Sequence, residues 1–391
     1  MKVLIYSEYF LPISGGVQTI VLELARGLAV WKPHGSDKPI EVTIVTRTRE
    51  QMAGEHNQPF RLERSPTLSR LVQLVREADL LHLAGPVILP LAMGLLFHKP
   101  VIVEHHGYQS VCPNGLLLYE PDHSICPGYF MERRYSMCLR CNTQAVGRRK
   151  SVRDLVLTFP RRWMCELASR NIAVTKHVSE RISLPRTRVI YHGVTDSGDS
   201  SAFEGLHDAR EPFKIGYVGR LVSEKGLPLL LNAAKRLDDD GFRFHLTIVG
   251  DGTEREHLES QARELKFMNP VDFLGELHGD ALEQAVRPIQ VIVMPSQCEE
   301  TAGLAAIEQM MRGGVVVAAD IGGLGEVVDE GGLKFPMGDS EGLYSRLREL
   351  IERPSFRASL RVAARKRAVQ AFGRDSMIDA HVSTYHEVLG R

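Results

Sequence analysis

Short apolar segments alternate with amphipathic helical patterns along most of this chain, and that alternation restricts the folds open to it. In the first 50 residues, a strand pattern at 3–6 is followed by a helical pattern at 17–29 and a second strand pattern at 42–45. Short, continuously apolar strands are buried on both faces, and helices connect them when they run parallel. The pattern therefore predicts the α/β class, with doubly wound parallel sheets.

The alternation occurs twice, on either side of a polar stretch at 196–212 that is rich in Gly, Ser and Asp. A chain of 391 residues suits two domains of ordinary size. We therefore predict a Rossmann-like N-terminal domain over 1–195, a linker over 196–212 and a Rossmann-like C-terminal domain over 213–370. A helix over 371–391 ends the chain, and it could pack back on the N-terminal domain.

Charge and hydropathy argue against several classes of protein. The chain has 48 Lys and Arg against 48 Asp and Glu, so it lacks the basic excess of a general nucleic-acid-binding protein. Its longest apolar stretch, 87–97, is shorter than the roughly 20 residues that span a bilayer. The first residues lack the pattern of a signal peptide. We expect a cytoplasmic protein.

One segment departs from this neutral balance. Residues 131–170 hold ten Lys or Arg against three Asp or Glu. This excess has two interpretations: a solvated surface, or a face that contacts anionic lipid head groups or a phosphorylated acceptor. The second interpretation predicts peripheral attachment to the inner face of the plasma membrane through basic residues 133–170.

Two carboxylates, Glu300 and Glu308, stand eight residues apart just after an apolar strand pattern at 291–294. The pattern at 303–311 predicts a helix that begins between them. Ligands of parallel α/β sheets bind at the carboxyl ends of the strands, and helix N-termini attract anions. Carboxylates beside an anion site suit a ligand that also carries hydroxyl donors, such as a nucleotide sugar.

A loop with two cations follows another strand pattern, at 214–218. Arg220 and Lys225 are five residues apart in this loop, which ends at Gly226. Arginine offers a bidentate fork to phosphate and lysine a mobile point charge. Together they could balance the charge of a departing nucleoside diphosphate, so we expect catalysis to need no metal.

These motifs, in this order, resemble the retaining glycosyltransferases of family 4. Those enzymes have the GT-B fold, in which two Rossmann-like domains face each other across a cleft. The resemblance covers nearly the whole chain. It rests on Gly15-Gly16, His106-Gly107, His192-Gly193-Val194, Gly219-Arg220-Leu221, Glu224-Lys225-Gly226, Val249-Gly-Asp-Gly252, Phe273-Leu-Gly275, Pro295-Ser296, Glu300, Gly303-Leu304, Glu308 and Gly322-Gly323 with Glu326.

The resemblance implies a role for each matching residue of the second half. Arg220 and Lys225 would hold the donor diphosphate. Glu308 would accept hydrogen bonds from the ribose, and Glu300 from hydroxyls of the transferred sugar. The backbone N–H groups of Gly303 and Leu304 would meet the diphosphate or the sugar.

In the first half, the resemblance assigns donor binding to Gly15 and Gly16, whose missing side chains let the backbone approach the reacting centre. His106 would face the sugar near its reacting carbon. Three positions depart from the family pattern: Ala302 replaces an aromatic residue, Gln309 replaces alanine, and 31–39 replaces a Gly-His pair. These departures leave the donor sugar open.

The chain is thus expected to move a sugar from a UDP- or GDP-sugar to a glycan or lipid-linked acceptor, in the synthesis of cell-envelope polysaccharide or glycolipid. Two alternatives stay open: a nucleotide-sugar epimerase or hydrolase on the same fold, and a binding module without turnover. A dinucleotide oxidoreductase is disfavoured because no G-x-G-x-x-G is present. Asp238-Asp-Asp240 follows a helical pattern and precedes a strand, and we interpret it as a turn.

Four cysteines lie close together in the sequence, within the expected insertion 108–150 of the first domain. They are Cys112, Cys126, Cys138 and Cys141, and the last two form a C-x2-C pair. Four thiolates make a closed structural zinc site, and C-x2-C is a common half of one. Zinc and unbound thiols are both compatible with this spacing. A zinc-held loop here would directly follow His106 and shape the acceptor pocket.

Overall fold

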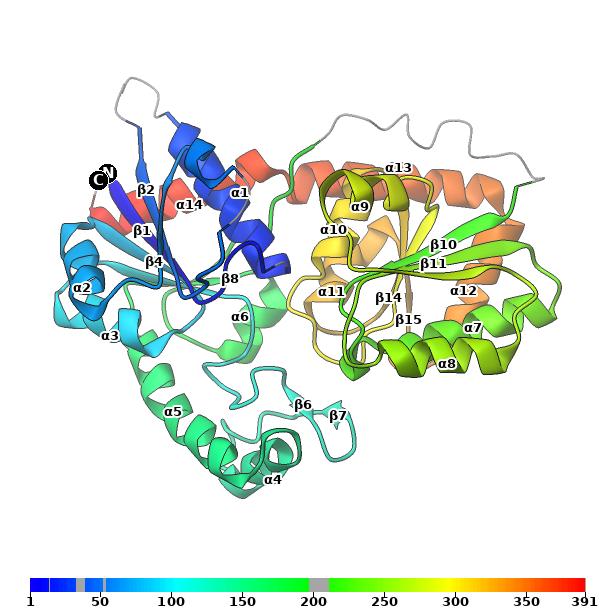
Figure 1. The fold of residues 1–391 in the computed structure, drawn as a ribbon, viewed down its shortest axis with the longest axis horizontal. Helices are drawn as coiled ribbons and strands as arrows, with labels where there is room; N and C mark the ends of the chain where they lie inside the picture. The colour runs from blue at the N-terminus through cyan, green and yellow to red at the C-terminus, as the bar shows by residue number, and fades with distance from the viewer. Residues whose placement is uncertain (14, 33–38, 52–53, 197–210, 391) are drawn as a thin grey trace. The chain divides into compact units, whose positions relative to one another are not determined.

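The computed structural model describes residues 1–13, 15–32, 39–51, 54–196 and 211–390, and its chain divides into two units. The first unit is Met1–Thr195 with Gly373–Arg391, and the second is Asp196–Phe372 (Figure 1). Most of the linker expected at 196–212, and most of the departure at 31–39, lie outside the described residues. No described helix is long and apolar enough to cross a membrane.

The first unit contains a seven-stranded parallel sheet. Its strands lie in the order β3 (Arg61–Arg64), β2 (Glu41–Thr46), β1 (Lys2–Ser7), β4 (Leu80–Ala84), β5 (Val101–His105), β8 (Arg170–Ala173) and β9 (Thr187–Val189). Its helices include α1 (Gly16–Val30), α2 (Leu68–Glu77), α3 (Ile88–Leu96), α6 (Lys176–Ile182) and α14 (Arg374–Leu389). The order reverses between β1 and β4, as in a Rossmann-like sheet.

The C-terminal helix α14 belongs to the first unit and packs on α1 (Figure 1). Gly27 of α1 allows this close approach, because a Cβ there would lie 2.4 Å from Cδ1 of Ile378. At the helix end, Trp31 Nε1 donates to Asp379 Oδ1 over 2.9 Å. The chain therefore crosses from the second unit back to the first just before α14.

The second unit contains a six-stranded parallel sheet with the same kind of order. The strands are β12 (Val271–Gly275), β11 (Phe244–Val249), β10 (Phe213–Val218), β13 (Val291–Met294), β14 (Val315–Ala319) and β15 (Leu333–Phe335). The helices are α7 (Leu227–Asp239), α8 (Arg255–Leu265), α9 (Gly279–Val286), α10 (Leu304–Met311), α11 (Gly322–Val328), α12 (Ser340–Glu352) and α13 (Pro354–Ala371). Both sheets confirm the predicted class, two doubly wound parallel α/β units.

Apolar strand residues explain the core of the second unit. Ile215, Ile248 and Val293 are fully buried between helices on the two faces of the sheet. At the end of α7, the buried Asp238 accepts from the backbone N–H groups of Met268 and Asn269. Asp238 thus closes a connection at the edge where β11 begins.

The expected insertion 108–150 of the first unit has regular structure that continues past its predicted end. It contains a small antiparallel hairpin, β6 (Leu118–Tyr119) with β7 (Ser124–Ile125), and two helices, α4 (Tyr135–Val146) and α5 (Arg148–Leu167). Gly147, with a φ of 79°, separates the two helices in a conformation that suits glycine. Helix α5 carries apolar residues on its buried and its exposed sides, so no single helical face marks it in the sequence.

Candidate active site

The predicted donor-site residues of the second unit follow the two strands at which the sheet order reverses. Arg220 and Lys225 come after β10, and Glu300 and Glu308 come after β13. Such a topological switch point is where doubly wound sheets bind ligands. Gly226 (φ 67°) lets the β10 loop press against the β13 segment, because a Cβ at this position would lie 2.1 Å from the Pro295 carbonyl oxygen.

Lys225 and Glu300 form a buried ion pair at this switch point. Lys225 Nζ lies 2.6 Å from Glu300 Oε1, and the side chains are 18% and 10% exposed. Ser296 Oγ also donates to Glu300 Oε1. Burial alone would raise the pKa of Glu300, but the Lys225 charge and these hydrogen bonds outweigh it and hold that pKa below its usual value. Burial opposes the charge of Lys225 as well, yet Glu300 keeps the Lys225 pKa raised.

Glu308 lies on α10, eight residues after Glu300, and its carboxylate has no hydrogen bond or ion pair to another described residue. Burial raises the pKa of Glu308 above its usual value, although the charge of Arg312 opposes this. A half-buried carboxylate without a fixed partner is ready to accept hydrogen bonds from a ligand. Glu300, in contrast, already holds two donors.

The remaining predicted residues of the second unit border the same segment. Gly303 is the N-cap of α10 in the left-handed conformation (φ 77°), and Leu304 is the first helical residue. Arg220 is largely exposed and lies 3.6 Å from Glu224 within its loop. Its backbone carbonyl accepts from the hydroxyl of Tyr217 over 2.9 Å. The cation is thus free to reorient while its backbone is held.

In the first unit, Gly15 and Gly16 follow β1 and begin α1, so they lie at the switch point of the first sheet. Both are exposed. Gly15 is the N-cap and has an extended backbone. The structure therefore places backbone N–H groups at a helix start beyond β1, where the resemblance expected a close approach to the donor.

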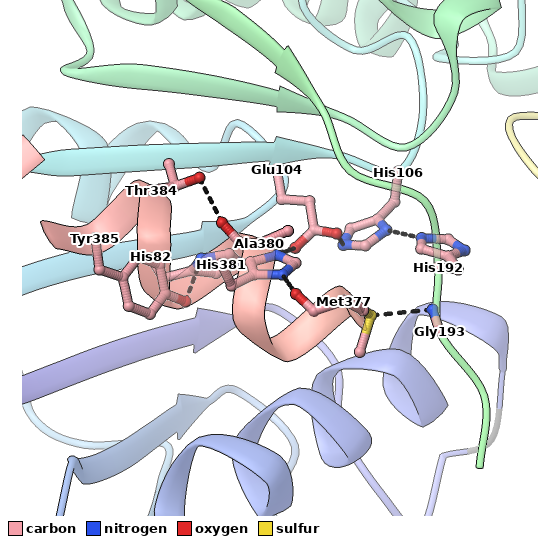
Figure 2. Close-up of polar contacts among 10 residues, drawn as sticks. All are labelled: His82, Glu104, His106, His192, Gly193, Met377, Ala380, His381, Thr384 and Tyr385. Atoms are coloured by element: carbon pink, nitrogen blue, oxygen red, sulfur yellow. Dashed lines mark hydrogen bonds and ion pairs between the residues drawn. The ribbon is translucent and has the colours of Figure 1, made fainter. Parts of the chain in front are cut away.

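His106 follows β5 and belongs to a buried group of polar side chains around Glu104 (Figure 2). His106 Nδ1 lies 3.1 Å from His192 Nε2, and His106 Nε2 lies 3.8 Å from Glu104 Oε1. Burial lowers the pKa of His106 against the opposing charge of Glu104. Burial and the His106 charge lower the pKa of His192 to about 3. Both imidazoles are therefore neutral near pH 7.

Hydrogen-bond roles on the other side of Glu104 follow from the partners. Because an ionised carboxylate only accepts, His82 Nε2 donates to Glu104 Oε2 over 2.9 Å, and His82 Nδ1 accepts from the Tyr385 hydroxyl over 3.0 Å. His381 Nδ1 donates to the Met377 carbonyl over 2.8 Å (Figure 2). His381 Nε2 lies 3.4 Å from Glu104 Oε2. Helix α14 thus packs His381 against Glu104 directly and holds Glu104 through His82 by means of Tyr385.

The neighbouring histidine has a different environment. His105 is fully buried, and its Nε2 donates to Asn171 Oδ1 over 3.0 Å. Burial lowers the pKa of His105 to about 4. Its ring therefore serves the contact between β5 and β8, whereas His106 points toward Glu104 and His192.

Two overlapping groups of three ligand atoms lie within 4.8 Å of one another in the described residues. They are His82 with Glu104 and His381, and Glu104 with His106 and His192. A cation in the first group would have to break the 2.9 Å hydrogen bond from His82 to Glu104. We therefore interpret both groups as one hydrogen-bond network.

Sequence reasoning missed Glu104, His82, His381 and Tyr385. The available signal was a glutamate inside the apolar strand run 101–105, where a charge needs buried partners. Those partners could not be found from spacing, because His381 lies 277 residues away.

Comparison with known proteins agrees with this architecture. The family model described as Glycosyltransferase Family 4 matches residues 14–197, and the one described as Glycosyl transferases group 1 matches residues 202–367. The chain is 27% identical over 387 residues to a phosphatidyl-myo-inositol mannosyltransferase of Mycobacterium leprae, covering 95% of this chain and 93% of the relative. It is 32% identical over 176 residues to a glycogen synthase of Mycobacterium tuberculosis. That match covers 44% of this chain and only 42% of the relative.

Among solved structures, HepE of Anabaena in complex with UDP-glucose matches with a TM-score of 0.72 and 19% identity, over 99% of this chain and all of the other. Sucrose-phosphate synthase of Thermosynechococcus elongatus matches with a TM-score of 0.73 and 20% identity, over 100% and 99% of the two chains. These likenesses establish the GT-B fold. With the two family models spanning both units, the chain belongs to the family 4 glycosyltransferases.

Proposed function

We propose that this protein is a retaining glycosyltransferase that moves a sugar from a UDP- or GDP-sugar to a glycan or lipid-linked acceptor. The observation that carries the proposal is the buried Lys225–Glu300 pair at the switch point of the second sheet, with Glu308 on the helix that follows. A cation for the diphosphate and two carboxylates for hydroxyls are the groups that a nucleotide sugar needs.

The chemistry follows from the charge that develops during transfer. As the bond to the diphosphate breaks, negative charge grows on the leaving oxygens, and Arg220, Lys225 and the start of α10 stabilise it. With two cations available, the site needs no metal for this step. The carboxylate beside His106 is Glu104, which accepts a hydrogen bond from His82. The acceptor is therefore proposed to attack from the side that the diphosphate leaves. The departing phosphate then takes the acceptor proton.

The donor and acceptor classes draw on the relatives. HepE was crystallised with UDP and with UDP-glucose, and the mycobacterial relative is named for mannosyl transfer to phosphatidyl-myo-inositol. These names support a nucleotide-diphosphate hexose as donor and a lipid-linked or cell-envelope glycan as acceptor. The place of action is proposed to be the cytoplasmic face of the plasma membrane.

Helix α5 supplies a surface suited to that place. Its N-terminal residues Arg148, Arg149, Lys150 and Arg153 are exposed cations. One side of the helix also carries an exposed apolar stripe, whose residues are three or four positions apart. Each is between 43% and 60% exposed: Val152, Val156, Phe159, Trp163 and Leu167. A basic helix with such a stripe lies well on an anionic lipid surface, with the apolar side chains in the interface.

Two experiments test the proposed function. The first screens UDP- and GDP-sugars for thermal stabilisation, because a ligand that binds the folded state raises the melting temperature more as its concentration exceeds its dissociation constant. The preferred donor is then used in transfer assays. We expect Lys225→Ala and Arg220→Ala to lower turnover by orders of magnitude while circular dichroism stays unchanged. Near-normal transfer by either variant contradicts the assignment.

The second experiment measures sedimentation with vesicles of anionic phosphatidylglycerol or neutral phosphatidylcholine. We expect binding to anionic vesicles only, and loss of binding in Trp163→Asp. Val362→Asp is the matched control, because Val362 is 70% exposed on α13 in the other unit. Equal binding by both variants contradicts a lipid-facing α5.

A further inference from the structure

Four of the six cysteines converge in the insertion of the first unit. Cys112 lies in the loop after β5, Cys126 directly follows β7, and Cys138 and Cys141 lie one turn apart on α4. All four are buried, with 6–7% exposure. The Asn114 side chain connects two of them: its Oδ1 accepts from the Cys112 thiol over 2.8 Å, and its Nδ2 lies 3.6 Å from the Cys141 sulfur.

Several N–H groups are directed at these sulfurs. The backbone N–H of Glu120 lies 3.4 Å from the Cys141 sulfur, which as a thiol donates to the Leu118 carbonyl over 3.4 Å. Burial raises the pKa of the Cys112 thiol, and backbone N–H groups of Leu117, Gly115 and Asn114 oppose that shift by favouring the thiolate. A neutral thiol is a weak acceptor, whereas a thiolate uses such donors well. Donors of this kind form the outer shell of metal–thiolate sites.

The insertion holds its four cysteines on short elements. One of its buried apolar clusters contains Phe130, Cys138 and Leu155, with Tyr129, Tyr135 and Leu139 packed against it. The insertion also buries Tyr108, Val111, Leu117, Leu118 and Tyr119. The hairpin β6–β7 has two residues in each strand. Short elements of this kind gain stability from an added cross-link. A metal bound by four thiolates from three elements would provide it.

We propose that Cys112, Cys126, Cys138 and Cys141 together bind one structural Zn²⁺. The zinc displaces four thiol protons and forms four Zn–S bonds, which leaves a net charge of −2. N–H donors and the basic surroundings of the insertion, ten Lys or Arg against three acids over 131–170, offset that charge. No three of the sulfur atoms lie within 4.8 Å of one another. Because Zn–S bonds of about 2.3 Å place sulfurs roughly 3.8 Å apart, zinc would draw the cluster inward.

The position of this site gives it a consequence. The Cys112 loop directly follows His106-Gly107, and α4 leads through Gly147 into α5. Zinc would therefore fix both the loop beside His106 and the base of the exposed helix. This inference does not depend on the proposed transfer reaction, because metal content is measured without any substrate.

The test starts with metal analysis of full-length protein purified without added zinc or chelator. We expect about one zinc per chain, and we expect Cys112→Ser and Cys138→Ser to lose it. Cys165→Ser and Cys298→Ser are matched controls, because both cysteines are buried but lie outside the cluster, and they should keep the metal. Since cluster variants could fail to fold, wild-type protein produced in cobalt medium provides a second measurement, the charge-transfer absorption of tetrahedral cobalt thiolate.

Two results would overturn the inference. The first is a wild-type protein that contains no stoichiometric metal. In that protein the four cluster thiols would either all be alkylated under native conditions or be found as disulfides by mass spectrometry. The second is zinc that stays bound in both cluster variants, which would place it elsewhere. Transfer activity measured on the same samples shows separately whether the proposed function stands.

Discussion

The Lys225–Glu300 pair permits a quantitative prediction about the second unit. Lys225→Met removes the charge while keeping the length of the side chain. Glu300→Gln removes the opposite charge and keeps an acceptor for the Ser296 hydroxyl. The single variants each leave one buried charge without its partner, whereas the double variant leaves none. The stability of all four proteins therefore forms a double-mutant cycle.

The magnitude follows from burial and geometry. The two side chains are 18% and 10% exposed, and their charged atoms are 2.6 Å apart. Breaking a buried pair by removing one partner costs about 3 kcal/mol or more, because the remaining charge stays desolvated. Removing both costs much less than the sum of the single effects. We expect about 3 kcal/mol for each single variant, about 3 kcal/mol for the double variant, and hence a coupling of about 3 kcal/mol.

The assay must report on the second unit. Both tryptophans, Trp31 and Trp163, lie in the first unit, so intrinsic tryptophan fluorescence would follow the wrong part of the chain. Hydrogen–deuterium exchange on peptides from β10 and β13 measures the free energy of opening of the central strands directly. Peptides from β1 and β4 of the first sheet serve as an internal control and should not change.

The pH dependence of the coupling energy gives an independent check that Glu300 acts as a charged partner of Lys225. Because the folded-state pKa of Glu300 is lowered, its stabilising contribution is complete above the unfolded-state pKa and is lost as pH falls through the folded value. The coupling should therefore persist at pH 7 and decline in acid below about pH 4. Single-variant costs that simply add at pH 7, to within about 0.5 kcal/mol, would refute a buried, interacting pair.

Three further predictions concern single positions. Glu308→Gln should weaken UDP binding in calorimetry about tenfold or more, because a charged acceptor for the ribose is lost, and unchanged affinity would contradict that role. Glu104→Gln should move the acid limb of the kcat/KM profile to lower pH, because the Glu104 charge raises the pKa of His106; a shift upward would contradict this. Gly226→Ala should lower the free energy of opening of β10, measured by hydrogen exchange, by about 2 kcal/mol or more. The new Cβ would meet the Pro295 carbonyl and the φ of this residue is positive, so an unchanged free energy would contradict this contact.

The strands and the convergence at the second switch point could be predicted from sequence. Each central strand is a short apolar run, and residues that follow adjacent parallel strands must emerge at one edge. The loop with Arg220 and Lys225 and the segment with Glu300 could therefore be placed at one edge before any coordinates. The direct Lys225–Glu300 contact could not, because it depends on how closely the Gly226 loop approaches Pro295.

Two features escaped prediction for a different physical reason. The apolar stripe of α5 faces outward, so the hydrophobic period that reveals a buried helix face gives no single answer there. The Glu104 network joins β4 and β5 to α14, at the far end of the chain. The packing of α14 on the first unit brings His381 to Glu104 and Tyr385 to His82.

The Lys225–Glu300 contact also indicates the order of events at the proposed donor site. Without donor, each charge satisfies the other, so neither residue is left as an isolated buried ion. A diphosphate that reaches Lys225 competes with Glu300 for the same ammonium group. As Lys225 turns to the phosphate, Glu300 becomes free to accept a hydrogen bond from a sugar hydroxyl. A nucleoside diphosphate without a sugar would leave the Glu300 charge without a replacement for Lys225, although Ser296 still donates to it. The intact donor completes both exchanges and should bind with greater stabilisation than the nucleotide alone.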